Sequence, residues 1–194
     1  MPLDQELISK STIKSMDSLD KIVSTECPHL FFIEDFLDHS LLKKLVNFIS
    51  TADVEWVKEI DQEYLNRLKL LWIFDSVVEE VHIVLDNLTE KLNQKFNKTN
   101  KFIGLTVWKD QEGYTISPHN KDNDLIDIAI QVYLTEGNID LSTKFEYNGK
   151  ILHPNYKINS GYLYDNSVGV RHYMTTPVPQ NYTRFSLYAI WSKR

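Results

Sequence analysis

Residues 126–134 read IDIAIQVYL, a short run that is rich in β-branched and apolar side chains. Such a composition predicts a β-strand. Comparable short runs lie at residues 102–108 and 184–191, and Gly, Asn, Asp and Pro interrupt the sequence between these runs. The C-terminal half of the chain is therefore predicted to be mostly β, with room for about eight short strands, which suits a jelly roll.

The N-terminal half begins with a polar arm and then becomes helical in pattern. Residues 1–29 are predicted to form a loosely packed arm, because they are polar, contain several serines and show little periodicity. Residues 30–33 are an apolar strand candidate. Asp38 then predicts the start of an amphipathic helix, since its side chain can cap the apolar-periodic segment that follows. A second helical piece is predicted over residues 61–72.

A long third helix is predicted from Ser76, or the residue before it, to Phe96, where apolar side chains recur with a 3.6-residue period. The helical region, 38–98, thus precedes the β region, 102–192. Helices followed by a run of strands predict an α+β fold. We expect one domain, residues 30–194, in which the helices pack on one face of a double-stranded β-helix, or jelly roll.

Composition and charge narrow the classes of function. Of the 194 residues, 42% are hydrophobic and 25% are charged, as in a folded globular protein. The net charge of -6 and the absence of a basic cluster argue against a nucleic-acid partner. Cys27 is the only cysteine, which favours a reducing compartment. With neither a secretory signal nor an apolar stretch of bilayer length, we expect a cytoplasmic protein without a membrane partner.

Two histidines in the β half are candidate metal ligands. His119 lies in the segment SPHNKD and His172 in VRHYM, and each borders a predicted strand. A jelly roll brings distant strands side by side, so two imidazoles and one carboxylate could share one face of an octahedral metal. That arrangement, with open positions for cosubstrate and oxygen, favours iron(II).

A candidate carboxylate site follows twelve residues after the second histidine. Strand alternation places Arg184 and Ser186 on the same face of the last predicted strand. A guanidinium group can hold a carboxylate through two parallel hydrogen bonds, and a serine hydroxyl can donate a further one. The pair therefore suits the distal end of a dicarboxylic keto acid.

The order of these features resembles the prolyl 4-hydroxylase-like branch of the iron(II) and 2-oxoglutarate dependent oxygenases, especially its small viral and bacterial members. The resemblance covers roughly residues 31–191, and its motifs are short, so their order and spacing carry it. The matching features are Gly113, His119, Asp122, the strand ending at 130–134, the segments 142–145 and 159–162, His172 and Arg184.

The resemblance implies a reaction and a set of site residues. The reaction uses iron(II), 2-oxoglutarate and O2, decarboxylates 2-oxoglutarate to succinate and hydroxylates an unactivated C–H bond. His119, Asp122 and His172 would then be the catalytic metal ligands. Arg184 would bind 2-oxoglutarate, assisted by Ser186 and Tyr133.

One position departs from the family pattern. The first motif of the family is His-x-Asp, but Lys121 occupies the third place here and the carboxylate arrives one residue later. A protonated lysine cannot bind a metal. Three interpretations are open. A one-residue bulge could bring Asp122 to the metal, which is the interpretation we favour, or Asp124 could approach the metal from the following loop. In the third interpretation, the site has lost its carboxylate ligand.

Three functions follow from these alternatives. The first is a dioxygenase that hydroxylates a peptide side chain, such as a prolyl residue, or a small molecule. The second is a noncatalytic jelly-roll binding module that has lost the metal carboxylate, which Lys121 favours. The third, a cupin-like metalloenzyme that does not use 2-oxoglutarate, is disfavoured by the pair Arg184 and Ser186.

Overall fold

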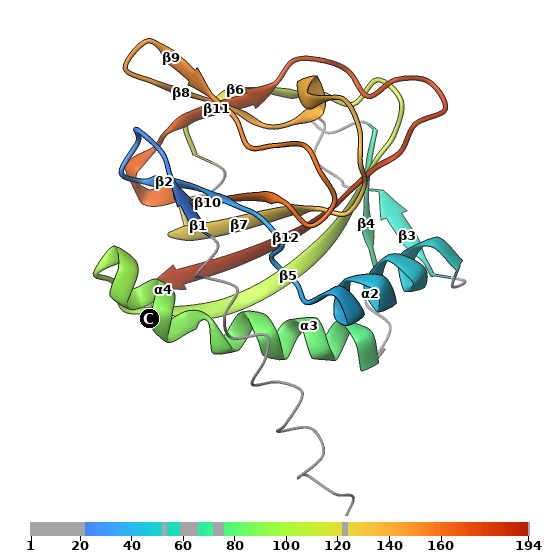
Figure 1. Cartoon of the computed structure of the whole chain (residues 1–194), viewed down its shortest axis with the longest axis horizontal. Helices are drawn as coiled ribbons and strands as arrows, with labels where there is room; N and C mark the ends of the chain where they lie inside the picture. Colours follow the sequence, from blue (N-terminus) through green and yellow to red (C-terminus); the bar gives the residue numbers. More distant parts are fainter. Residues whose placement is uncertain (1–21, 52–53, 59–65, 72–75, 122–123, 194) are drawn as a thin grey trace, which may run out of the picture.

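The larger of two antiparallel sheets forms the centre of the molecule, with the smaller sheet on one side and helices on the other (Figure 1). This computed structural model describes residues 22–51, 54–58, 66–71, 76–121 and 124–193. The three-layer arrangement confirms the predicted α+β class and the jelly roll.

Within the described ranges the larger sheet contains eight strands and the smaller sheet contains four. The order in the larger sheet is β1 (Ile22–Ser24), β2 (Leu30–Ile33), β10 (Gly161–Asp165), β7 (Ile128–Tyr133), β12 (Arg184–Lys193), β5 (Asn100–Asp110), β4 (Arg67–Leu70) and β3 (Trp56–Lys58). The order in the smaller sheet is β6 (Ile116–His119), β11 (Arg171–Met174), β8 (Lys144–Tyr147) and β9 (Lys150–Leu152). Strands distant in sequence are thus neighbours in each sheet.

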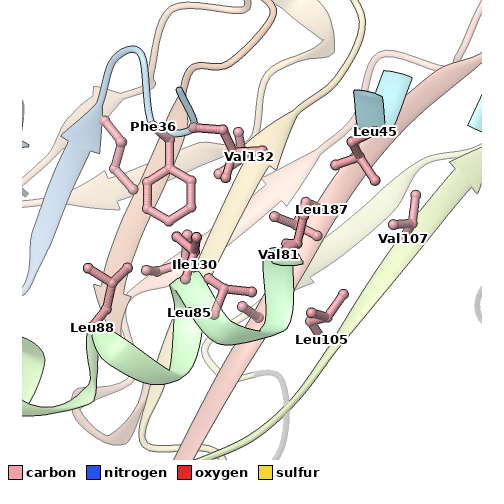
Figure 2. Packing of buried hydrophobic residues seen from close by; sticks show 14 of the residues in the cluster. Phe36, Leu45, Val81, Leu85, Leu88, Leu105, Val107, Ile130, Val132 and Leu187 are labelled. Atoms are coloured by element: carbon pink, nitrogen blue, oxygen red, sulfur yellow. The ribbon is translucent and has the colours of Figure 1, made fainter. Parts of the chain in front are cut away.

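The main hydrophobic core lies between the larger sheet and the helices, which are α2 (His39–Thr51), α3 (Ser76–Asn87) and α4 (Thr89–Phe96). Figure 2 shows Val81 and Leu85 of α3 facing Ile130 of β7 and Leu187 of β12. Side chains alternate between the two faces of a strand. Apolar residues of β7 and β12 face the helices, so the residues between them face the smaller sheet. The described helices thus lie on the face of the larger sheet that is opposite to the smaller sheet.

Two predicted helix starts are borne out by the backbone. The Asp38 Oδ1 atom accepts hydrogen bonds from the N–H groups of Ser40 and Leu41, at 2.9 and 3.0 Å, which is the predicted cap of α2. The predicted long helix begins at Ser76, but it is divided into α3 and α4 at Leu88. Each half still directs apolar side chains toward the larger sheet, so the division preserves the predicted amphipathic face.

The predicted helix over residues 61–72 is wrong in the part that the structure describes. Arg67–Leu70 is the strand β4, which pairs with β5 on one side and β3 on the other. The alternation Arg-Leu-Lys-Leu has the two-residue period of a strand, and pairing with the long strand β5 satisfies its backbone groups. Residues 61–65 and 72 lie outside the described ranges.

The end of the predicted arm joins the larger sheet. Ile22–Ser24 pairs with β2 as β1, and the Cys27 side chain is fully buried, whereas residues 1–21 lie outside the described ranges. Among the helices that the structure describes, none has the length and apolarity needed to cross a membrane.

Candidate functional site

The interior between the two sheets holds most of the predicted site residues. Ser186 of β12 lies opposite Tyr133 of β7 in the strand register, and Arg184 is two residues away on the same face of β12. This face is opposite to the one that carries Leu187 into the helix-packed core. Arg184, Ser186 and Tyr133 therefore face the smaller sheet, and the first two share the face that alternation predicts for them.

His119 and His172 are brought together by the pairing of β6 with β11. The two residues lie directly opposite each other in the strand register, and their ring centroids are 4.2 Å apart. They are separated by about fifty residues in the sequence, so only the sheet makes them neighbours. Neighbouring imidazoles of this kind can supply two ligands to one metal ion.

Each histidine ring is oriented by a backbone carbonyl. The Nδ1 atom of His119 lies 2.7 Å from the Ser117 carbonyl oxygen, and the Nδ1 atom of His172 lies 2.9 Å from that of Val170. In a neutral ring this hydrogen bond places the proton on Nδ1, so Nε2 carries the lone pair that a metal ion requires. The contact with the carbonyl thus favours, in each ring, the tautomer that a metal ligand requires.

Aromatic side chains hold the second histidine in place. His172 is only 2% exposed, and its ring stacks on Phe145 with a centroid distance of 5.4 Å and an interplanar angle of 25°. The Tyr164 ring lies 5.2 Å from it on another side. A ligand fixed in this way loses little conformational freedom when it binds a metal.

The third ligand is not supplied by the described part of the loop after β6. The Asp124 carboxylate is 90% exposed and lies 3.6 Å from the Lys121 ammonium group, so it is directed to solvent and to this cation. Within the described ranges no group of three or more His, Cys, Asp or Glu side chains could hold a metal ion. Asp122 lies outside those ranges, so the structure describes only the two histidines of the predicted ligand set.

Arg184 is fully buried and retains an open hydrogen-bonding edge. Its Nη1 atom donates to Asp110 Oδ2 at 2.5 Å, whereas Nε and Nη2 have no hydrogen-bond partner among the described residues. Nε and Nη2 form one side of the guanidinium fork, which matches the two oxygens of a carboxylate. Buried polar groups without a partner are rare in folded proteins, so this edge fits an anionic ligand.

The charge of Arg184 is maintained inside the protein. Burial alone would lower the pKa of its guanidinium group, but the electrostatic interactions with Asp110 and the neighbouring tyrosines raise the pKa above its ordinary value. Arg184 therefore stays protonated, as a carboxylate-binding group must.

Ser186 is oriented by a chain of hydrogen bonds. The Tyr162 hydroxyl donates to Gln131 Oε1, and Gln131 Nε2 donates to Ser186 Oγ at 2.8 Å. Gly161 permits the close approach of β10 to β7 that this chain needs, because an added Cβ would lie 1.8 Å from the Gln131 carbonyl oxygen. Since Ser186 Oγ accepts from the amide, its own proton can be donated to a ligand.

Tyr133 and two hydroxyl residues complete the polar part of the interior. The Tyr133 hydroxyl accepts a hydrogen bond from the Thr143 N–H at 2.9 Å, and the Tyr133 ring lies 5.2 Å from Arg184 Cζ. Burial raises the pKa of Tyr133, so its phenol keeps a proton to donate. The hydroxyls of Ser142 and Thr143 are buried and have no hydrogen-bond partner among the described residues.

Four residues of this interior were missed by sequence reasoning. The alternation of residues 67–70 marks β4 as a strand and places Arg67 on one face with Lys69. This pattern was the sequence signal from which Arg67 could have been found. Gln131 and Thr143 lie in the segments 130–134 and 142–145 that the resemblance singled out, but without a role, and Asp110 had no local signal. The roles of all three depend on partners in other strands.

Solved structures share this fold at low sequence identity. A prolyl-4-hydroxylase of Pseudomonas putida matches with a TM-score of 0.63 and 16% identity, over 94% of this chain and 99% of that chain. A prolyl hydroxylase of Trichoplax adhaerens, in complex with a hypoxia inducible factor oxygen degradation domain peptide fragment, matches with a TM-score of 0.66 and 11% identity, over 98% and 94%. The chain has the fold of the 2-oxoglutarate and iron(II) oxygenases.

Another matching solved structure contains bound ligands. HygX of Streptomyces hygroscopicus, with nickel, 2-oxoglutarate and hygromycin B bound, matches with a TM-score of 0.63 and 8% identity, over 98% of this chain and 88% of that chain. No family model and no curated protein matches the sequence, so the fold alone supports the relationship. The predicted resemblance is confirmed at that level.

Proposed function

We propose that the chain is an iron(II) and 2-oxoglutarate dependent dioxygenase that hydroxylates a peptide side chain, such as a prolyl residue, or a small molecule. The observation that supports this best is the open, fully buried edge of Arg184, in the same interior as the paired histidines. An apolar-walled interior with one carboxylate-binding cation and two adjacent imidazoles suits a keto acid beside a metal ion.

The metal would be held by His119, His172 and Asp122. The Nδ1 contacts with backbone carbonyls favour the tautomers that leave Nε2 for a metal, and the pairing of Asp124 with Lys121 supports the assignment of Asp122 as the carboxylate of this loop. Iron(II) bound there would supply the activation of dioxygen, for which protein side chains alone have no chemistry.

The cosubstrate would be oriented by its distal carboxylate. Arg184 can donate two parallel hydrogen bonds from Nε and Nη2, and the Ser186 hydroxyl can add a third because Gln131 already donates to its oxygen. Tyr133 and Thr143 border the same region and have protons to donate. These contacts would hold the distal carboxylate of 2-oxoglutarate, and its keto acid end would then be available to a metal held by the histidine pair.

The walls of the interior would keep water away from the reaction. Phe145, Tyr162 and Tyr164 are nearly or completely buried and contact one another or His172, and the buried Tyr133 ring packs on Tyr156. A dry surrounding strengthens the electrostatic interactions with the cosubstrate and limits loss of reactive species to solvent.

The proposed activity can be tested on the purified protein. Addition of 2-oxoglutarate to the protein with iron(II), without oxygen, is expected to produce a visible charge-transfer absorption band. Admission of oxygen is then expected to yield succinate, because decarboxylation accompanies dioxygen activation in this reaction class. Binding of metal without the band and without succinate would instead indicate the binding module.

The choice of carboxylate ligand gives a matched pair of variants. We expect Asp122→Ala to weaken Mn(II) binding by about 100-fold or more, because one of three protein ligands is removed and this exceeds the cost of losing an outer-shell partner. Asp124→Ala, two residues away and exposed, should leave the affinity within about twofold, as expected for a surface charge. Isothermal titration with Mn(II) measures both, and equal effects of the two variants would contradict the assignment of Asp122.

A further inference from the structure

Arg184 belongs to a buried row of three charged residues. Arg67 of β4, Asp110 of β5 and Arg184 of β12 occupy one register row across three neighbouring strands. Asp110 and Arg184 are completely buried, and Arg67 is 8% exposed. Charges removed from water must be balanced locally, so the three side chains form one electrostatic unit.

Arg67 is bound to Asp110 through a full guanidinium fork. Its Nε and Nη2 atoms donate to the two carboxylate oxygens of Asp110, at 2.6 and 3.1 Å. The Arg67 guanidinium also lies over the rings of Trp108 and Tyr114, at 4.7 and 4.3 Å from their centroids. This geometry holds Arg67 against Asp110 and fixes the position of the carboxylate.

Asp110 in turn restrains Arg184 by only one nitrogen. Its Oδ2 atom accepts from Nη1, which orients the guanidinium and leaves Nε and Nη2 without a hydrogen-bond partner among the described residues. The row contains two positive charges and one negative charge. Because the charge of Arg67 compensates that of Asp110, the row keeps a net positive charge, which lies on Arg184.

We propose that Arg67 is a positioning residue that determines the preference for a dicarboxylic keto acid, by neutralising Asp110 and so reserving the charge of Arg184 for the distal carboxylate of the cosubstrate. This inference rests on the proposed function. Without Arg67, Asp110 and Arg184 would form a neutral pair, and a carboxylate entering the interior would meet no net positive charge.

Two keto acids separate this effect from general damage to the site. 2-Oxoglutarate and 2-oxopentanoate have the same five-carbon chain and the same keto acid end, but only 2-oxoglutarate has a distal carboxylate. The ratio of their dissociation constants, measured by isothermal titration in the presence of Mn(II), therefore reports on the distal contact alone. A site that is merely disordered by mutation should bind both keto acids less tightly.

In the unaltered protein we expect 2-oxoglutarate to bind about 100-fold more tightly than 2-oxopentanoate, as for a buried charge-assisted contact. Arg67→Met should reduce this preference by about tenfold or more, since the net charge of the row falls to zero. Arg67→Gln serves if the methionine variant does not fold, because glutamine keeps a donor for Asp110 without a charge. Arg171→Met is the control, since Arg171 is a half-exposed arginine paired with Glu146.

A double variant provides the sharpest outcome. Asp110→Asn combined with Arg67→Met removes the negative charge as well, so Arg184 regains an uncompensated charge and the preference should return to within about threefold of the original. A preference that is unchanged in Arg67→Met, or that is not restored in the double variant, would overturn the role of Arg67. Absence of any preference in the unaltered protein would overturn the proposed function itself.

Discussion

Arg184→Met is expected to weaken the binding of 2-oxoglutarate by about 100-fold or more, because loss of a buried charge-assisted pair costs about 2–5 kcal/mol and each 1.4 kcal/mol is about tenfold. The variant removes both the charge and the open Nε and Nη2 edge. Asp110 retains its two-pronged contact with Arg67, so the buried carboxylate is still compensated. Isothermal titration with Mn(II) and 2-oxoglutarate measures the change.

A conservative variant and a control make this result specific. Arg184→Lys keeps the charge but cannot contact Asp110 and present a fork at the same time, so its affinity should lie between those of the original and the methionine variant. Arg171→Met should leave the affinity within about twofold, as an exposed ion pair contributes little. If Arg184→Met binds 2-oxoglutarate as tightly as the unaltered protein, the cosubstrate lies elsewhere.

His172→Ala is expected to lower the affinity for Mn(II) by about 100-fold or more and to abolish succinate formation, since ligand loss exceeds the 10–100-fold cost of losing an outer-shell partner. The histidine is buried against Phe145 and Tyr164, so the alanine also leaves a cavity. Metal titration monitored by the rise in the thermal unfolding temperature separates the two effects. A destabilised protein that still binds metal would gain stability from Mn(II), whereas the proposed outcome is no gain.

His153→Ala is the matched control for the metal ligand. His153 is exposed in the loop after β9, and its removal should change neither metal affinity nor turnover. His172→Gln repeats the test with a side chain that fills more of the space left by the imidazole. Retention of the original metal affinity in both His172 variants would show that the histidine pair is not a metal centre.

The sequence predicted the site residues whose chemistry is visible in one segment. Arg184 and Ser186 share a face because a strand alternates, and this followed from three consecutive residues. His119 and His172 could be nominated as ligands, but their distance of 4.2 Å between ring centroids depends on the β6–β11 pairing. No local pattern encodes a register between strands so far apart in the chain.

Fold prediction failed where a short segment lacked a decisive period. Residues 67–70 were assigned to a helix, although the alternation of charged and apolar residues fits a strand, because four residues give little contrast between the two periods. The pairing with β5 decides the conformation, since it supplies the backbone partners that a four-residue helix would lack. This error also affected the prediction of the site, because Arg67 of this strand donates a hydrogen bond to Asp110.

By itself the sequence determined that helices precede the main run of strands, which apolar faces build the core, and which chemical types are available for a site, since these depend on local periodicity and on side-chain identity. The tertiary structure alone decided that two histidines meet, that Tyr162 and Gln131 orient Ser186, and that Arg184 has one edge held and one edge open. The physical reason is that hydrogen bonds and charge compensation across a sheet join residues of different strands, and strand register is set by the packing of the whole core.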